Sequence, residues 1–582
     1  MLALAGTTLI LAPIGYLAMF SGFHAYDDEG SILITLKDYL SGHPLLTPNT
    51  PYYGPFFYET IGGLFKLLGI APTNDSGRLV TLVFWLVASA LAAFAAYRLT
   101  RNLWITLVVQ LVTFILLTAL TREPMTVYGL LSLLMLGLVV AASFASTRPR
   151  ATAVAIGAIV AALCLVKINV GAFAVLAVVF AWAGGLAPRW RRFALPAMGV
   201  AITVAPLLLM ANLLARAWVL EFALVVSISA AAVSLAVILA PPPKLASPSS
   251  AWLILGGVTA AALTLAVALA GGTHVADVWN GLVVRSLQFS QLFTWPVDVN
   301  PVVVVGVALS LAACVAYSRV RVSDSTADLI RIGAGLFILL SIVLLQSSLW
   351  LLGLSLAWIA TRARRDEPNQ YMRLLLPALA VLESLHAYPV AGSQLSVAAL
   401  LMIPVGAVVL NDGIAGLTAR GAARVAPAAL ILATAVLALE GFLAGSLFAA
   451  GSPSGLRGAE LVRMPARQGA QLRQLVAAID SDCSSFITFP GMNSIYIWTG
   501  QEPPSDLRYG VWWLTPDPVD QQAVVRQLEG ESRLCVIKNQ TLIDFWAQGH
   551  QVPAQPVVDF INASFIPKAT FGDYELLIRK AQ

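Results

Sequence analysis

Stretches of about 20 consecutive apolar residues recur along the first 450 positions of the chain, and this length crosses the hydrocarbon core of a membrane. In hydrocarbon every backbone polar group needs a partner within the chain, so each stretch is expected to be helical. We count about 13 to 15 of them. Only 11% of the 582 residues are charged and 58% are hydrophobic, whereas an average soluble domain has about 25% charged residues. The sequence therefore predicts an all-α polytopic membrane domain.

The first apolar stretch, from Leu2 to about Phe20, lacks the two flanking features of a cleaved signal peptide. It has no basic region before it, and no small-residue cleavage site precedes the polar segment at His24. We expect this stretch to be a retained helix.

The composition changes from about Gly451 onward, after which polar residues and a normal density of charge predominate. Helical spacing is expected from Ala466 to Ile479. Three short runs are typical of strands, and they are Ser484–Phe489, Leu534–Ile537 and Tyr574–Ile578. We predict a membrane domain over 1–450, with a long outer loop at 21–77, and a small soluble α/β domain over 451–582.

The four cysteines fall into two pairs with different surroundings. Cys164 and Cys314 lie within apolar stretches, whereas Cys483 and Cys535 lie in the polar C-terminal region. An oxidising compartment would permit a disulfide between the second pair. The sequence leaves open whether the two sulfurs meet.

Lys and Arg residues gather in alternate loops between the apolar stretches, and the net charge of +5 is spread over them. The positive-inside rule assigns these loops to the cytoplasm, so the basic charge indicates orientation and not nucleic-acid binding. The residues of this set are Arg98, Arg101, Arg148, Arg150, Arg189, Arg191, Arg192, Lys244, Arg319, Arg321, Arg362, Arg364, Arg365, Arg420 and Arg424.

The remaining connections are then expected on the outer side, together with the C-terminal domain. They are the segment 21–77, the turn Thr121–Pro124, the neighbourhood of Lys167 and Asn169, the segment Gly271–Asn300 and the turn His386–Gln394. The helix count between Ala151 and Gly185 decides the orientation of everything downstream. Any chemistry is expected on this outer face.

Three consecutive acids, Asp27, Asp28 and Glu29, follow the first apolar stretch and precede an amphipathic run, Ser31–Leu40. One interpretation is that they cap a surface helix, because negative charge at a helix N-terminus is stabilising by about 0.3 to 1 kcal/mol. One acid suffices for that role, and three adjacent carboxylates repel one another. We therefore favour proton transfer or cation binding.

An acidic cluster after the first helix, a surface helix and then a Tyr-Gly-Pro element, Tyr53–Pro55, resembles the GT-C glycosyltransferases. Within that class the first 200 residues are similar to the bacterial protein-mannosyltransferase-like and aminoarabinose-transferase-like families, which use polyprenyl-phosphate sugars as donors. Arg122-Glu-Pro124 is similar to the Arg-Pro-Asp element of those families, although here Glu precedes Pro. The resemblance implies a GT-C-like fold and an inverting hexosyl or pentosyl transferase.

The resemblance also implies roles for individual residues. Asp28 matches the first acid of the family's acidic pair and is expected to be the general base, with Asp27 and Glu29 assisting. Cations near the outer face are expected to stabilise the departing phosphate, and Lys167, Arg122 and Arg285 are the candidates. The further candidates for substrate binding are Glu123, Asn169, Tyr53, Tyr58, Tyr388 and Gln394.

Several of these residues have a simpler interpretation. Lys167 would equally be explained by snorkelling from a helix end, and Arg285 by anchoring of an interfacial helix. Pro389 and Gly392 account for the turn at 386–394 by backbone geometry alone. A divalent cation, Mg²⁺ or Mn²⁺, held by the three adjacent acids stays open, because carboxylate oxygens suit hard ions.

The sequence predicts transfer of a sugar from a polyprenyl-phosphate donor to a glycan, lipid or protein acceptor of the cell envelope. The Ala-, Val- and Leu-rich spans and the Arg-biased loops are typical of a bacterial cytoplasmic membrane protein. The alternative is a transporter or flippase of lipid-linked saccharides, or a non-catalytic scaffold. Few charges lie within the spans beyond Glu221 and Lys167, which favours an interfacial active site over a transport path.

Overall fold

The computed structural model describes residues 2–46, 53–241, 248–345, 347–362, 369–417, 424–505, 511–514 and 517–580. Part of the expected outer loop, 47–52, therefore lies outside the described residues. The same holds for four of the expected cytoplasmic basic residues, Lys244, Arg364, Arg365 and Arg420.

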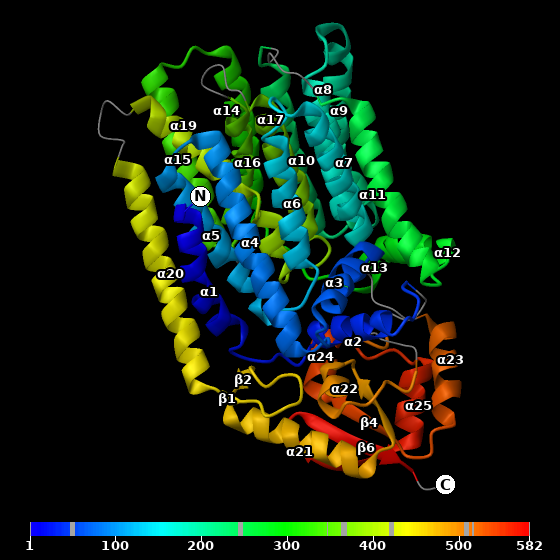
Figure 1. The fold of residues 1–582 in the computed structure, drawn as a ribbon. Coiled ribbons are helices and arrows are strands. Elements are labelled where there is room, and N and C mark those ends of the chain that lie inside the picture. The colour runs from blue at the N-terminus through cyan, green and yellow to red at the C-terminus, as the bar shows by residue number, and fades with distance from the viewer. Residues whose placement is uncertain are drawn as a thin grey trace.

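A bundle of long helices forms the larger part of the molecule (Figure 1). Within the described ranges, 11 segments are helical, long and apolar enough to cross a membrane. They are α1 (Leu2–Met19), α4 (Asn74–Thr100), α5 (Leu103–Thr118) with the 3₁₀ turn Ala119–Arg122, α7 (Pro149–Val166), α9 (Pro188–Leu209), α10 (Ala217–Ile238), α11 (Ser250–Ala270), α14 (Pro301–Arg319), α15 (Asp324–Val343), α18 (Gln394–Ala399) with α19 (Met402–Leu417), and α20 (Val425–Ala450).

Shorter helices complete the bundle and its lower end. Those within the bundle are α6 (Tyr128–Ala142), α8 (Ile168–Gly184), α16 (Leu349–Ser355) and α17 (Gln370–Glu383). Those at the end nearest the C-terminal region are α2 (Asp28–Leu40), α3 (Pro55–Leu68), α12 (Val275–Trp279) and α13 (Arg285–Leu292). The predicted polytopic membrane domain is confirmed, and the stretch 151–185 contains two helices, α7 and α8, which meet at Lys167.

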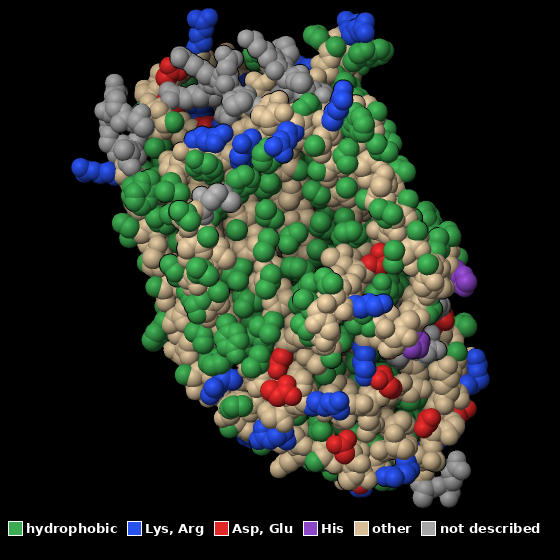
Figure 2. Space-filling model, viewed as in Figure 1, with side chains coloured by type: hydrophobic (Ala, Val, Ile, Leu, Met, Phe, Trp, Pro, Cys, Tyr) green, Lys and Arg blue, Asp and Glu red, His purple; other side chains and the backbone are tan. Residues whose placement is uncertain are grey.

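The surface of the bundle has the distribution expected of a protein in lipid. Hydrophobic side chains cover its middle zone on the face shown in Figure 2, and Lys and Arg side chains gather at the end opposite the C-terminal domain. Ile431 and Phe442 on α20 are each 71% exposed. An exposed apolar surface of this kind is costly in water, so lipid is the solvent that fits it.

The C-terminal region folds into an α/β domain at one end of the bundle (Figure 1). A short antiparallel pair, β1 (Ser452–Pro453) and β2 (Arg463–Met464), leads into a four-stranded sheet of order β3-β4-β6-β5. Strands β3 and β4 are parallel, and the other two pairs are antiparallel. The sheet strands are β3 (Ser485–Phe489), β4 (Leu534–Asn539), β5 (Phe565–Phe571) and β6 (Tyr574–Arg579), and the helices are α21 (Ala466–Asp482), α22 (Ser494–Thr499), α23 (Pro518–Glu529), α24 (Gln540–Ala547) and α25 (Pro556–Ser564).

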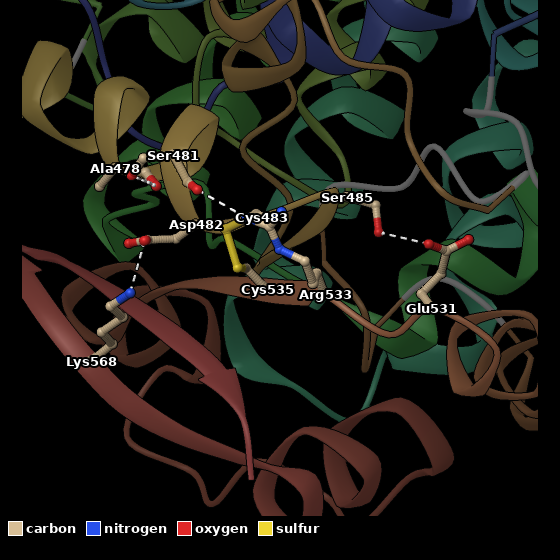
Figure 3. Close-up of a disulfide and its surroundings, with 9 residues drawn as sticks. All are labelled: Ala478, Ser481, Asp482, Cys483, Ser485, Glu531, Arg533, Cys535 and Lys568. Carbon is tan, nitrogen blue, oxygen red and sulfur yellow. Dashed lines mark hydrogen bonds and ion pairs between the residues drawn. A yellow bond between two sulfur atoms is a disulfide. The ribbon is translucent and has the colours of Figure 1, made fainter. Parts of the chain in front are cut away.

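A disulfide between Cys483 and Cys535 ties the end of α21 to the parallel strand pair (Figure 3). Two polar contacts lie beside it. Arg533 donates to the backbone oxygen of Ser481 at 2.9 Å, and Lys568 of β5 pairs with Asp482 at 2.8 Å. The disulfide closes a loop of 52 residues, so it restricts the unfolded chain over much of the domain.

Replacing both Cys483 and Cys535 by Ser should lower the stability of the protein by about 2 to 5 kcal/mol, because the unfolded chain regains the entropy of the open loop. The melting temperature of the purified protein in detergent measures this. Dithiothreitol should lower the wild-type value toward that of the double variant and leave the variant unchanged. Equal melting temperatures for both proteins would contradict a structural role for the bond.

Candidate active site

The acidic segment lies where the helical bundle meets the C-terminal domain. Helix α2 runs across the end of the bundle, with the C-terminal domain on its other side (Figure 1). The three carboxylates at its start have three different environments, and these environments decide what each can do.

Asp27 joins α2 to the C-terminal domain. Its backbone is left-handed, with φ of 47°, and its carboxylate accepts a hydrogen bond from the amide of Gly30, as an N-cap residue does. The same carboxylate accepts from the amide and the hydroxyl of Ser494 in α22, at 2.6 and 2.7 Å. A Cβ atom on Gly30 would lie 2.2 Å from the Ser494 nitrogen, so this close contact requires glycine.

Further buried hydrogen bonds extend this junction. Asn74, at the start of α4, donates to the Ser494 hydroxyl at 3.0 Å and accepts from the indole of Trp498 at 3.1 Å. Asn493 donates to the hydroxyl of Ser31 at 3.2 Å. Because the partners come from both ends of the chain, the C-terminal domain fixes the position of the start of α2.

Glu29 forms a buried ion pair with Arg78 of α4. The shortest contacts between the guanidinium and the carboxylate are 2.9 Å, and both side chains are almost fully buried. Arg78 also donates to the backbone oxygens of Met19 and Gly22, each at 2.9 Å. This pair therefore holds the end of α1, the start of α2 and α4 together.

Asp28 is the acid of the three that the fold leaves uncommitted. Its side chain is half-buried and forms no hydrogen bond or ion pair with another described residue. Burial raises its pKa well above the usual value, and the neighbouring carboxylates of Glu123 and then Asp27 raise it further. Asp28 and Glu123 thus form a carboxylate pair for which a proton is more favourable than in water.

Glu123 brings the second outer turn to Asp28. It follows the 3₁₀ turn at the end of α5, and Ser393 donates to its carboxylate at 2.6 Å. Burial raises the pKa of Glu123, while the Ser393 hydrogen bond and the charge of Lys167 lower it. Burial lowers the pKa of Lys167 to about 8, and Glu123 opposes that shift. Asp28, Glu123 and Lys167 therefore form one electrostatically coupled cluster.

The Tyr-Gly-Pro element explains how Tyr53 reaches this unit. Gly54 donates its amide to the backbone oxygen of Val166 at 2.9 Å, one residue before Lys167 at the bend between α7 and α8. A Cβ atom on Gly54 would lie 1.9 Å from the backbone oxygen of Leu165. Burial raises the pKa of the Tyr53 hydroxyl, and Asp28 and Glu123 are among the groups that raise it further.

The other predicted residues divide into near and distant ones. Arg122 is exposed beside the cluster, since its charge acts on His24 and Tyr26. Gln394 hydrogen-bonds Tyr128, as Ser393 also does. Four predicted residues have other neighbours: Tyr58 packs on Phe57, Asn169 accepts from the amide of Val170, Arg285 lies by Asp520 of α23, and Tyr388 lies by Trp218 and Arg216.

Two tyrosines of the cluster, Tyr26 and Tyr128, were not among the residues predicted from the sequence. Burial raises the pKa of Tyr26, and Glu123 and Asp28 both raise it further. The ring of Tyr128 lies 5.9 Å from the Lys167 ammonium and edge-on to His386 at 5.7 Å. Their positions in the sequence could have identified them, since Tyr26 directly precedes the three acids and Tyr128 lies five residues after Glu123.

The residues present do not fit a divalent-cation site built from the three adjacent acids. The carboxylates of Asp27 and Glu29 are engaged by Ser494 and Arg78, which leaves Asp28 with Glu123. Lys167 lies beside Glu123 and would repel a cation. Among the described residues, no group of three or more His, Cys, Asp or Glu side chains is arranged to hold a metal ion.

Comparisons with known proteins find a distant likeness among solved structures. No protein-family profile and no curated protein matches the sequence. Among solved structures, the chain is similar to the crystal structure of ArnT from Cupriavidus metallidurans bound to undecaprenyl phosphate. The identity is 12% and the TM-score 0.47, over 100% of this chain and 98% of that chain. A likeness at this distance carries no argument about individual residues or activity.

Replacing Glu29 by Gln should destabilise the protein by about 3 to 5 kcal/mol, because it leaves the charge of Arg78 buried without its partner. The midpoint of denaturant unfolding in micelles measures the loss. The double variant Glu29→Gln, Arg78→Met should recover part of it, since both charges are then absent. A single variant as stable as the wild type would contradict the structural role of the pair.

The titration of Asp27 should make stability depend on pH. Burial raises its pKa from 3.8 to about 7 in the folded protein. The folded state therefore binds the Asp27 proton more tightly than the unfolded state does. The protonated carboxyl stabilises the fold fully below about pH 4, and this stabilisation is lost as the pH rises through about 7.

We expect the melting temperature of the wild type to fall more steeply between about pH 4 and pH 7 than that of Asp27→Asn. The melting temperature of the variant is lower at every pH, because the two Ser494 hydrogen bonds go to different oxygens of Asp27 and an amide has one oxygen. The slope with pH is therefore the readout. Asp480→Asn, on the exposed face of α21, is the matched control and should keep the wild-type slope. Parallel slopes for wild type and Asp27→Asn would refute the assignment.

Proposed function

We propose that the protein is an inverting membrane glycosyltransferase of the GT-C class, which transfers a sugar from a polyprenyl-phosphate donor to an acceptor of the cell envelope. The observation that carries the proposal is the environment of Asp28. An uncommitted carboxylate lies beside a second carboxylate and near a half-buried lysine, where an apolar bundle meets a polar domain. Proton acceptance and anion stabilisation are the two requirements of this reaction.

In the proposed reaction Asp28 accepts the proton of an acceptor hydroxyl. The hydroxyl oxygen forms a bond to the anomeric carbon of the sugar while the bond from that carbon to the phosphate oxygen breaks. Attack from the face opposite the phosphate inverts the anomeric centre. The leaving group is the polyprenyl phosphate anion, and Lys167 and Arg122 are the cations placed to stabilise it.

The neighbours of Asp28 suit it to this task. A carboxylate with a pKa raised by burial and by Glu123 is a stronger base than one in water. Ser393 and Lys167 favour the charged form of Glu123, and that negative charge raises the pKa of Asp28. Asp27 and Glu29, which were expected to assist in catalysis, are here assigned to positioning, since Ser494 and Arg78 occupy them.

The surroundings of Lys167 suit a lipid-linked donor. Lys167 lies at the bend between two apolar helices, and the Tyr53–Pro55 element and α3 pack against the same end of α7. On α3, Leu67 and Leu68 are 83% and 55% exposed. A polyprenyl chain that runs from a phosphate at Lys167 along α3 would therefore meet apolar surface at the far end of this helix.

We further propose that the C-terminal domain and the active site lie outside the cytoplasm, at the cytoplasmic membrane of a bacterium. The basic end of the bundle is opposite the C-terminal domain (Figure 2), which supports this orientation by the positive-inside rule. The disulfide between Cys483 and Cys535 also supports it, because such bonds persist in oxidising compartments.

Replacing Asp28 by Asn should lower donor turnover by about 10² to 10⁴, because the base is lost, while donor binding persists. Purified protein with a short-chain polyprenyl-phosphate sugar and equilibrium binding of the same donor measure the two effects. Asp38→Asn, ten residues along α2, is the matched control and should keep full turnover. Unchanged turnover in Asp28→Asn would remove Asp28 as the base, and absence of donor binding to wild type would overturn the glycosyltransferase assignment.

A further inference from the structure

A second site lies at the seam between the bundle and the C-terminal domain. It is a cavity of about 250 Å³ between the end of α13 and the residues around α24, which we call the Trp546 cavity. Its lining also includes Arg216, at the start of α10. The lining residues are Arg216, Gln291, Leu292, Phe293, Thr294, Trp513, Leu514, Trp546, Ala547, Gln548, His550, Gln551 and Pro553.

The lining combines aromatic rings with side chains that both donate and accept hydrogen bonds. Trp546 provides a half-buried indole and Trp513 a buried one, while Gln291, Gln548 and Gln551 provide carboxamides. None of the described lining residues is Asp or Glu, and Arg216 is the positive group among them. Aromatic faces with carboxamide hydrogen bonds suit a polyhydroxylated ring that is neutral or weakly anionic.

One side of the cavity is held by packing and hydrogen bonds, and the other side is open to solvent. Trp546 packs edge-on against Phe293 with ring centroids 5.2 Å apart, and Arg216 donates to the hydroxyl of Thr294 at 2.8 Å. Gln548 donates to the backbone oxygen of Thr294 at 3.3 Å. By contrast, the side chains of His550 and Gln551 are exposed. A ligand therefore enters from the aqueous side and not from lipid.

One side-chain contact connects the cavity to Asp28. Phe545, the neighbour of Trp546 in α24, stacks on Tyr26 with ring centroids 6.3 Å apart. The charges of Glu123 and Asp28 in turn raise the pKa of Tyr26, so its hydroxyl lies near both carboxylates. The cavity and the proposed base are therefore separated by the Phe545 and Tyr26 rings.

A backbone contact makes a second connection. Trp295, next to the cavity residue Thr294, donates its amide to the oxygen of Pro389 at 3.0 Å and accepts from the amide of Ala391 at 2.9 Å. This loop continues to Ser393, which donates to Glu123 at 2.6 Å. The edge of the cavity is thus fixed relative to the carboxylate pair.

We propose that the Trp546 cavity binds the acceptor, and that the acceptor is a soluble oligosaccharide or the end of a polysaccharide chain. This inference rests on the proposed function and specifies its acceptor class. One sugar ring lies against the indole of Trp546, and the chain continues past the Phe545 and Tyr26 rings so that its terminal residue presents a hydroxyl to Asp28. The donor approaches from the lipid side and the acceptor from water, so each has its own entrance.

The test uses the full-length protein, a labelled short-chain polyprenyl-phosphate sugar and water-soluble oligosaccharides. The oligosaccharides are released by mild acid from the cell envelope of the bacterium that makes the protein. Label should enter the oligosaccharide fraction. Trp546→Ala and Gln551→Ala should each raise the KM for oligosaccharide about tenfold or more. Trp546→Phe should retain most of the affinity, and Trp190→Ala, a 60% exposed indole at the start of α9, should behave as wild type.

Calorimetric titration with the same oligosaccharides separates this inference from the proposed function, because binding needs no turnover. Saturable binding that Asp28→Asn keeps and Trp546→Ala loses supports the cavity even if no transfer is seen. Label found in the lipid extract or on protein, an unchanged KM in both cavity variants, or no calorimetric binding to wild type would each overturn the acceptor assignment.

Discussion

The hydrogen bonds from Ser494 to Asp27 are the interaction on which the geometry of the candidate site depends. They join residues 467 positions apart and hold the C-terminal domain against the first turn of α2. Gly30 permits the contact, because a side chain at that position would collide with the Ser494 amide. Since Asp28 follows Asp27 directly, the position of its carboxylate is set by a domain that lies at the other end of the sequence.

The three adjacent acids illustrate how one motif divides into structural and chemical roles. Like charges in sequence repel when they share an environment, and the fold avoids this by giving two of them separate donors. Arg78 neutralises Glu29, and the Ser494 amide and hydroxyl engage Asp27. Asp28 instead faces Glu123, so its proton affinity is raised by burial and by a second carboxylate. On this account the motif supplies two positioning groups and one base.

The sequence predicts much of the fold, because hydrophobic spans and local periodicity are local signals. It predicts α2 and the strands β3, β4 and β6, but it misses β5, an edge strand that carries Pro567 and Lys568 and leaves most of its side chains exposed or half-buried. Asp28 and Glu123 follow from motifs and Lys167 from its position between two apolar stretches, and the three lie in one cluster. The role of Ser494 could not be predicted, since no local pattern links it to Asp27. Arg285 and Tyr388 were placed by loop position alone, and loops on one face need not converge.

The most direct test of this account is a cryo-electron microscopy structure of the protein with a polyprenyl-phosphonate sugar, in which the scissile oxygen is replaced by carbon. The account predicts a phosphonate oxygen within about 3 Å of the Lys167 ammonium, with the anomeric carbon toward Asp28 and the prenyl chain along the apolar helices. A phosphonate bound away from Lys167, or a sugar whose anomeric carbon is turned from Asp28, would contradict it.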